Sequence, residues 1–295
     1  MTSAPRITVI TIVRNAEKTL KKAINSVLTQ AYSNLEYIII DGGSTDETVN
    51  IIKSYCSHLS YWHSKPDRGG NDAYNIGLQH ATGDIVSFLN ADDWYEDNIL
   101  QSVAQSFIQN QQPDVITCYT KIVKKTKEGK FKTFKNFNNA KQLELTLSNI
   151  LFATPLINAR FFKRSLFSKI GVFKPLDKEG NYLISADREL LIRAYQASVS
   201  QIILDKLGYV YLAHADSQTM STNKDTLIKV LKEHLQICKH HLSQDFLSHQ
   251  DKQMMNRWKN DQTRRLISAY IKSYQFKNAF KRLVTALLLR CNTSK

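Results

Sequence analysis

The amino-terminal half of the chain alternates short apolar runs with helical patterns, and this alternation constrains the fold more than any other feature. Four apolar runs with many β-branched side chains, as in buried strands, cover residues 6–13, 35–41, 84–90 and 114–123. Between the first two runs, residues 20–28 repeat their apolar side chains at helical spacing. Strands that alternate with helices predict an α/β fold with a parallel-dominated central sheet and helices on both faces.

The rest of the chain shows other patterns. A Lys-Glu-Gly-Lys sequence at 127–130, between two β-rich runs, predicts a hairpin turn. Residues 184–213 continue with a helical pattern followed by strand-forming side chains. From Asp225 onward the pattern is helical and proline is absent from the sequence. We therefore predict one α/β domain over residues 1–220 and a helical extension over residues 221–295.

Positive charge is concentrated in the predicted extension. Residues 220–295 contain 15 Lys or Arg and 5 Asp or Glu, within a chain whose net charge is +14. Apolar side chains recur at helical spacing from Leu266 to Leu288, flanked by Lys272, Lys277, Lys281 and Arg282. This basic amphipathic pattern has two interpretations, and both stay open. The apolar stripe packs on the α/β domain, or it docks on an anionic membrane surface.

Targeting and cysteine patterns indicate the compartment. The amino terminus has no signal-peptide cleavage pattern, and no stretch approaches the roughly 18 apolar residues of a membrane-spanning helix. The cysteines lack a Cys-x-x-Cys pair, so we expect reduced thiols and no zinc site at Cys56, Cys118, Cys238 and Cys291. We expect a cytoplasmic protein, and the basic tail would allow peripheral attachment to the cytoplasmic face of the inner membrane.

An acidic cluster follows the second predicted strand, at the sheet edge where doubly wound folds bind ligands. It runs Asp-Gly-Gly-Ser-Thr-Asp from Asp41 to Asp46. A carboxylate at a strand end can accept hydrogen bonds from a nucleobase or a ribose, and the glycines let another group approach the backbone. The alternative is a tight turn with a helix cap, which suits Asp46, and Ser44 with Glu47 forms a capping-box pattern.

A second acidic cluster, Asn-Ala-Asp-Asp-Trp, follows the strand at 84–90. Its adjacent carboxylates, Asp92 and Asp93, repel each other unless a cation neutralises them. Divalent cations with oxygen ligands often bridge a few protein carboxylates and substrate phosphates. The cluster therefore predicts an Mn²⁺ or Mg²⁺ site on a diphosphate, and the alternative is a pair of solvated loop aspartates.

Three segments together resemble a known family. DGGSTD at 41–46, PDRGGNDAYNIGLQHATGD at 66–84 and FLNADDWY at 88–95 are similar, in order and spacing, to family 2 glycosyltransferases with the GT-A fold. The resemblance is close over about residues 6–125 and looser to about residue 215. It implies that the domain at 1–220 is a Rossmann-like GT-A domain that binds a nucleotide-sugar, in a non-processive enzyme of the bacterial surface-glycan type.

The resemblance also implies roles for individual residues. Asp41 is similar to the nucleobase-binding aspartate of the family, and Asp92 and Asp93 resemble its metal and ribose-phosphate site. Because Asn90 replaces the leading acid of that motif, either Asp92 or Asp93 could be the main metal ligand. The residues implied in donor binding are Thr11, Val13, Asp41, Asp67, Arg68 and Asp92. His214 follows the last predicted strand and could approach the metal, although a lone histidine is more often structural.

Asp187 resembles the catalytic base of the family. A carboxylate at a helix start beside apolar residues can have its pKa raised enough to accept a proton from a sugar hydroxyl. The alternative is an aspartate that only caps the helix. Glu189 is the local rival for the role, but two residues along a helix it should point elsewhere.

These observations predict an inverting, metal-assisted transfer from a nucleoside-diphosphate sugar, with UDP favoured by the resemblance, to a hydroxyl of a glycan or lipid-linked acceptor. We expect no nucleic acid partner. Two alternatives stay open, a sugar nucleotidyltransferase and a non-catalytic binding protein. The first is disfavoured because no glycine follows the first strand, and the second because the acidic residues are retained. Asn158 and Ala159 replace a His-Gln pair that is common in related sequences, which puts acceptor contacts in doubt.

Overall fold

The computed structural model describes residues 4–175, 183–214, 223–244 and 247–273, together with Asn278 and Arg282. The chain divides into two compact units. The first comprises residues 1–175 and 186–214, and the second comprises residues 176–185 and 215–295. Because the boundary near residue 220 lies outside the described residues, the division into 1–220 and 221–295 remains a prediction.

The first unit contains the strands and the shorter helices. Its strands are β1 (Ile7–Val13), β2 (Leu35–Asp41), β3 (Tyr61–Ser64), β4 (Ile85–Asn90), β5 (Trp94–Tyr95), β6 (Val115–Lys125), β7 (Phe131–Phe137), β8 (Arg160–Lys163) and β9 (Gln201–Ala213). Its helices are α1 (Leu20–Leu28), α2 (Thr48–Ser54), α3 (Gly70–His80), α4 (Ile99–Gln109), α5 (Ala140–Leu143), α6 (Leu147–Phe152), α7 (Leu166–Ile170) and α8 (Ala186–Gln196), with 3₁₀ turns η1 (Cys56–His58) and η2 (Ile157–Ala159).

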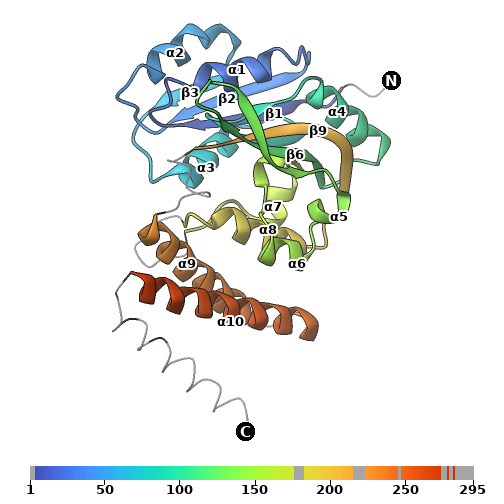
Figure 1. Ribbon diagram of the computed structural model, residues 1–295. Helices are drawn as coiled ribbons and strands as arrows, with labels where there is room; N and C mark the ends of the chain where they lie inside the picture. Colours follow the sequence, from blue (N-terminus) through green and yellow to red (C-terminus); the bar gives the residue numbers. More distant parts are fainter. Residues whose placement is uncertain are drawn as a thin grey trace. The chain divides into compact units, whose positions relative to one another are not determined.

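Within the described residues, one nine-stranded sheet has the order β3-β2-β1-β4-β8-β6-β9-β5, and β7 pairs with β6. Strands β3, β2, β1 and β4 are mutually parallel, β8 is antiparallel to both β4 and β6, and β6 is parallel to β9. Figure 1 shows helices lying against this sheet. The predicted α/β fold with a mostly parallel sheet is confirmed, whereas the short antiparallel strand β8 was not predicted.

The close packing of α3 against β1 fixes the position of this helix relative to the sheet. Strand β1 is buried along its length apart from a half-buried Ile12, as expected for a central parallel strand. A Cβ atom at Gly77 of α3 would lie 2.4 Å from Cγ2 of Ile10, so only glycine lets α3 approach β1 this closely. This approach fixes α3, which carries Tyr74 and Asn75 in its middle turns, against β1.

The second unit contains α9 (Lys224–Leu242) and α10 (His249–Lys272), which lie side by side in Figure 1. The Nζ atom of Lys224 donates to the carbonyl of Lys272, so the two helices are antiparallel. The apolar stripe is partly accounted for: Leu266 and Tyr270 are buried against α9, while Ile271 is exposed. The stripe beyond residue 273 lies outside the described residues, apart from two isolated positions.

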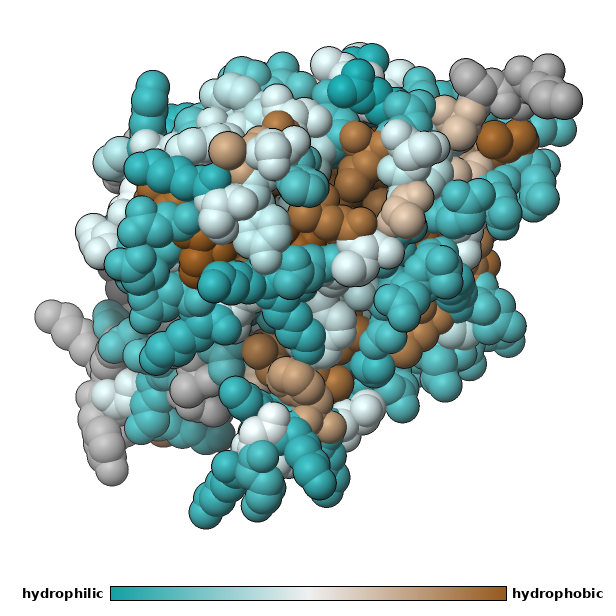
Figure 2. Space-filling view, turned by 90° about the horizontal axis from the view of Figure 1, so that it is seen from above, coloured by the Kyte–Doolittle hydropathy of each residue, from teal (hydrophilic) through white to brown (hydrophobic). Residues whose placement is uncertain are grey.

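None of the helices in the described part of the chain is long and apolar enough to cross a membrane. Figure 2 shows one face of the molecule, on which apolar side chains reach the surface in separate patches among hydrophilic ones.

Candidate functional site

The parallel strands end in register at one edge of the sheet. Val13 of β1 pairs with Asp41 of β2, and Asp41 pairs with Ser64 of β3. On the other side of β1, Ile12 pairs with Asn90 of β4. The two acidic clusters therefore follow strands that flank β1 on opposite sides, as the sequence predicted for a ligand-binding edge.

Asp41 is fully buried and holds the loop that follows β2. Its carboxylate accepts hydrogen bonds from the backbone N–H and the hydroxyl of Ser44, and from the hydroxyl of Ser64 at 2.6 Å. The predicted capping box is wrong, because α2 begins at Thr48 and the hydroxyl of Ser44 donates to Asp41 instead. Because Asp41 is fully buried and already accepts three hydrogen bonds, a ligand donor would have to replace one of the serine hydroxyls.

Thr11 and Val13 occupy different places on β1. The Thr11 side chain is fully buried, and its hydroxyl lies 3.0 Å from the hydroxyl of Tyr37. Val13 is the last residue of the strand, beside Asp41. The structure therefore places Val13 at the sheet edge and Thr11 inside the sheet, where it supports Tyr37.

Asp67 lies against the loop after β2. A Cβ atom at Gly42 would lie 2.7 Å from Oδ2 of Asp67, so the glycine permits this close approach. Burial raises the pKa of Asp67, and the charges of Asp72 and Asp41 add to the rise, although the Gly69 N–H bonds its carboxylate at 2.8 Å. Arg68 reaches Asp72 on α3 at 2.9 Å, and its side chain is 62% exposed.

Asp92 and His214 form the accessible part of the second acidic cluster. His214 Nε2 lies 2.8 Å from Oδ2 of Asp92, and the two side chains are 37% and 30% exposed. No group of three or more metal-binding side chains occurs among the described residues. The pair fits a divalent ion that takes its other ligands from a diphosphate and water, since such ions need few protein ligands.

Asp93, by contrast, is buried inside the protein. Its carboxylate accepts hydrogen bonds from the hydroxyl of Tyr209, from Asn90 at 3.0 Å and from the backbone N–H of Leu212 at 2.8 Å. Burial and the neighbouring charge of Asp92 raise the pKa of Asp93. These contacts tie the loop after β4 to β9 and direct Asp92 toward the surface.

The hydrogen bonds continue from Asp93 into the core. The hydroxyl of Tyr74 donates to Asn90 at 2.7 Å and accepts from Asn158 at 2.9 Å. This chain links η2, α3, β4 and β9. The sequence interpretation gave no role to Tyr74 or Tyr209, and the only signal was that Asn90 and Asn158 depart from the pattern of the family.

Asp187 lies in the first turn of α8 and is half-buried. Its Oδ1 atom accepts a hydrogen bond from the backbone N–H of Arg188 at 2.6 Å. Burial raises the pKa of Asp187, while the charge and the N–H of Arg188 act in the opposite direction. A carboxylate with a raised pKa at a helix start is suited to accept a proton.

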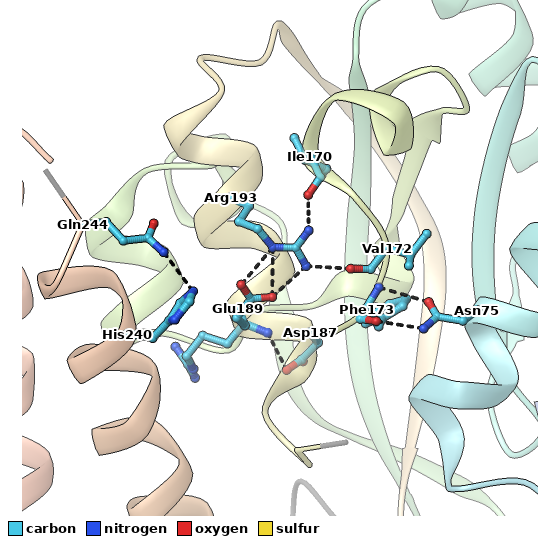
Figure 3. Close-up of polar contacts among 10 residues, drawn as sticks. Asn75, Ile170, Val172, Phe173, Asp187, Glu189, Arg193, His240 and Gln244 are labelled. Carbon is cyan, nitrogen blue, oxygen red and sulfur yellow. Dashed lines mark hydrogen bonds and ion pairs between the residues drawn. The ribbon is translucent and has the colours of Figure 1, made fainter. Parts of the chain in front are cut away.

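Glu189 is fully buried, and Figure 3 shows its carboxylate facing the guanidinium of Arg193. It pairs with Arg193 through contacts of 2.7–3.0 Å, and Arg193 also donates to the carbonyls of Ile170 and Val172. The side-chain amide of Asn75 donates to the carbonyl of the next residue, Phe173, and accepts from its backbone N–H. The rival of Asp187 is therefore already used to hold the segment after α7.

A groove of about 670 Å³ lies elsewhere, lined in part by Pro5, Asp84, Phe107 and Arg164. Pro5 and Asp84 precede β1 and β4, so this groove lies at the amino ends of the strands. Ligands of doubly wound sheets bind at the opposite edge, and the groove holds none of the predicted site residues.

This sheet, with acidic residues at its carboxyl edge, has the GT-A architecture of nucleotide-sugar-dependent transferases, and solved structures share it. S. aureus TarS, in a complex with UDP-GlcNAc, matches at a TM-score of 0.61 and 18% identity, over 92% of this chain and 73% of that chain. The mannosyltransferase PcManGT from Pyrobaculum calidifontis, in a complex with GDP-Man and Mn²⁺, also has a TM-score of 0.61, over 99% and 81%.

The chain belongs to glycosyl transferase family 2, whose model matches residues 8–171. An uncharacterised glycosyltransferase of Mycobacterium tuberculosis is 42% identical over 106 residues, which are 35% of this chain and 40% of that protein. A PGL/p-HBAD biosynthesis glycosyltransferase of Mycobacterium bovis is 30% identical over 198 residues, which are 65% and 71%. The chain therefore spans about two fifths of the first of these relatives and about seven tenths of the second.

Proposed function

We propose that this chain is an inverting glycosyltransferase that moves a sugar from a UDP-linked donor to a hydroxyl of a glycan or lipid-linked acceptor. Two features of one α/β unit support the proposal: the partly exposed Asp92–His214 couple, and the half-buried base candidate Asp187 at the start of α8. The TarS complex with UDP-GlcNAc supports a uridine donor, and the complex of the mannosyltransferase keeps a guanosine donor as the alternative for the test.

In this proposal the donor nucleotide lies along the carboxyl edge of β1 and β2. Asp41 would accept a nucleobase N–H in place of the Ser44 or Ser64 hydroxyl, and Val13 lies at the edge beside it. Asp67 and Arg68 follow β3, and the exposed guanidinium of Arg68 can meet the negative charge of the donor. Thr11 contributes indirectly, by fixing Tyr37 behind the edge.

Asp92 and His214 would hold a divalent ion against the donor diphosphate, and Asp93 would position them. Such an ion supplies positive charge that stabilises the leaving diphosphate. Because Mg²⁺ prefers oxygen ligands, a histidine ligand favours Mn²⁺ over Mg²⁺. We assign the role of main metal ligand to Asp92, because Asp93 is buried and its oxygens already accept three hydrogen bonds.

Asp187 would act as the general base of a single displacement. As the acceptor oxygen forms its bond to the anomeric carbon, the bond to the diphosphate oxygen breaks on the opposite face, and the acceptor proton passes to Asp187. The configuration therefore inverts. A half-buried carboxylate with a raised pKa suits this transfer because it is a stronger base than an exposed one.

A donor screen tests the proposal. Purified protein is incubated with UDP- and GDP-sugars, with and without a lipid-linked acceptor, and the released products are identified. We expect nucleoside diphosphate, released faster when acceptor is present. In a parallel incubation with UTP or GTP and a sugar 1-phosphate, release of pyrophosphate would indicate a nucleotidyltransferase. Binding of donor without release of any product would indicate a non-catalytic protein.

The metal assignment needs a separate readout. Calorimetric titration of UDP into EDTA-treated protein, with Mn²⁺ or Mg²⁺ added back, should show tighter UDP binding with Mn²⁺ than with Mg²⁺ or without metal. Equal UDP affinity in all three conditions would reject the metal site while leaving the transferase assignment in place.

A further inference from the structure

The hairpin of residues 124–136, at the end of β6 and along β7, is a strongly basic surface of the first unit. Every residue in it except Thr126 is exposed. The segment contains one acidic residue, Glu128, and six lysines: Lys124, Lys125, Lys127, Lys130, Lys132 and Lys135. The catalytic proposal gives this surface no role.

The hairpin is well formed locally. In its turn, the Thr126 N–H donates to the Lys130 carbonyl and the Gly129 N–H donates to the Thr126 carbonyl. Gly129 adopts the left-handed backbone conformation that such a turn requires. A bulge interrupts the pairing of the two strands next to Phe134. In the described sheet β7 pairs only with β6, so its outer edge is unpaired.

Lysines on an unpaired edge strand have a structural explanation, because they discourage edge-to-edge aggregation. That explanation does not account for the phenylalanines of the same hairpin. Phe131 and Phe134 are 45% and 55% exposed, and exposed apolar side chains favour association. Aromatic side chains interleaved with lysines instead indicate a partner that is anionic on its surface and apolar beneath it.

The two aromatic rings are already covered on one side by ammonium groups. Lys124 Nζ lies 3.9 Å from the ring centroid of Phe134, and Lys22 Nζ of α1 lies 4.0 Å from that of Phe131. Phe131 also contacts Trp94 at 5.0 Å between centroids. Stacking of nucleobases needs free ring faces, and the hairpin has no arginine, the residue that best recognises nucleic acid phosphates.

We propose that the hairpin docks this protein on an anionic lipid bilayer. The lysines would contact headgroup phosphates, and Phe131 and Phe134 would enter the boundary between headgroups and acyl chains. The proposal concerns binding and does not depend on the reaction. Trp94, two residues after Asp92, contacts the hairpin, so under the proposed function the same docking would bring the site close to a lipid-linked acceptor.

Vesicle co-sedimentation with the full chain tests the proposal. Vesicles of phosphatidylcholine with and without phosphatidylglycerol are compared for the wild type and for the triple variant Lys127→Gln/Lys130→Gln/Lys132→Gln. Wild type should bind only the anionic vesicles. The triple variant should bind them about 100-fold more weakly, since each basic residue near an anionic surface contributes roughly fivefold. Phe134→Ser should remove the binding that persists at high salt.

The matched control removes equal charge from the second unit, by Lys229→Gln/Lys239→Gln/Lys272→Gln, and should bind like the wild type. Circular dichroism melting curves confirm that each variant is folded. A loss confined to the control variant would assign docking to the helices and overturn the proposal. Equal losses in both variants would show a general charge effect and also overturn it. Binding of single-stranded RNA without binding of vesicles would do the same.

Discussion

Two pairs of neighbouring carboxylates, Asp92 with Asp93 and Asp187 with Glu189, look alike in the sequence and differ in the structure. Asp93 accepts three hydrogen bonds inside the core, and Glu189 is buried against Arg193. Asp92 and Asp187 are only half-buried, with His214 beside the first and the Arg188 N–H beside the second.

In each pair, one carboxylate stabilises the fold and thereby holds the other carboxylate in position. Asp93 anchors the loop from which Asp92 projects, and Glu189 fixes the helix on which Asp187 lies. A buried charged group is costly unless it is fully bonded, so the bonded member is the structural one. We propose that the chemistry falls to the half-exposed member in both places.

The largest expected effect is on turnover in Asp187→Asn. This change keeps the shape of the side chain and removes its basicity, so turnover should fall about 10²–10⁴-fold. UDP affinity should be unchanged, because Asp187 has no proposed role in donor binding. Steady-state kinetics and calorimetry measure the two quantities, and near-normal turnover would show that another group is the base.

Glu189→Gln should act on stability instead. Breaking a buried ion pair by removing one partner costs about 3–5 kcal/mol of the free energy of unfolding. Urea unfolding measures the loss, with Glu128→Gln in the exposed hairpin turn as the control, expected within about 0.5 kcal/mol of wild type. A wild-type unfolding curve for Glu189→Gln would break the comparison.

Asp92→Asn should affect ligand binding, whereas Asp93→Asn should affect the free energy of unfolding. Loss of an accessible charged ligand in Asp92→Asn should weaken Mn²⁺-dependent UDP binding roughly 10–100-fold without a change in unfolding. Asp93→Asn should lower the free energy of unfolding by about 1–3 kcal/mol, because buried donors lose a charged partner. If Asp93→Asn abolished metal-dependent binding while remaining as stable as wild type, the assignment of the two aspartates would be reversed.

Tyr74→Phe tests the chain of hydrogen bonds that runs from Asp93 into the core. The change leaves Asn90 and Asn158 without their shared hydroxyl, which should cost about 1 kcal/mol in the free energy of unfolding. Tyr55→Phe, which removes an exposed hydroxyl bond to Asn25, is the matched control and should cost less. Equal losses in the two variants would mean that the buried chain adds nothing.

The smallest effect is a shift in the pH profile. A protonated Asp187 cannot accept a proton, so the rate falls as the pH drops through its pKa. Because burial raises that pKa, the acid limb should lie at higher pH than for an ordinary aspartate near 3.9. The residual activity of Asp187→Asn should lack this limb, and an identical limb in the variant would assign it to a different group.

Sequence patterns were sufficient for the central strands and the long helices, because buried parallel strands such as Ile7–Val13 are continuously apolar. They failed for β8, whose four residues are too short for any periodicity. They also failed at Ser44, where a long-range arrangement overrides the local capping pattern.

The candidate site was likewise predictable from the sequence only in part. Motif order placed Asp41, Asp67 and Asp92 at one edge of the sheet, but motif order contains no information on burial. The residues whose hydrogen bonds distinguish Asp93 from Asp92, such as Tyr209, lie more than a hundred residues further along the chain. Only the fold brings them together, so the sequence left the choice between the two aspartates open.

The most direct test of the account is the turnover of Asp92→Asn, Asp93→Asn, Asp187→Asn and Glu189→Gln, measured under conditions in which unfolding curves show all four to be folded. The account predicts that the variants of Asp92 and Asp187 lose turnover at least tenfold and that the other two stay close to wild type. A fully folded Asp93→Asn or Glu189→Gln protein that lost as much turnover as its neighbour's variant would contradict it.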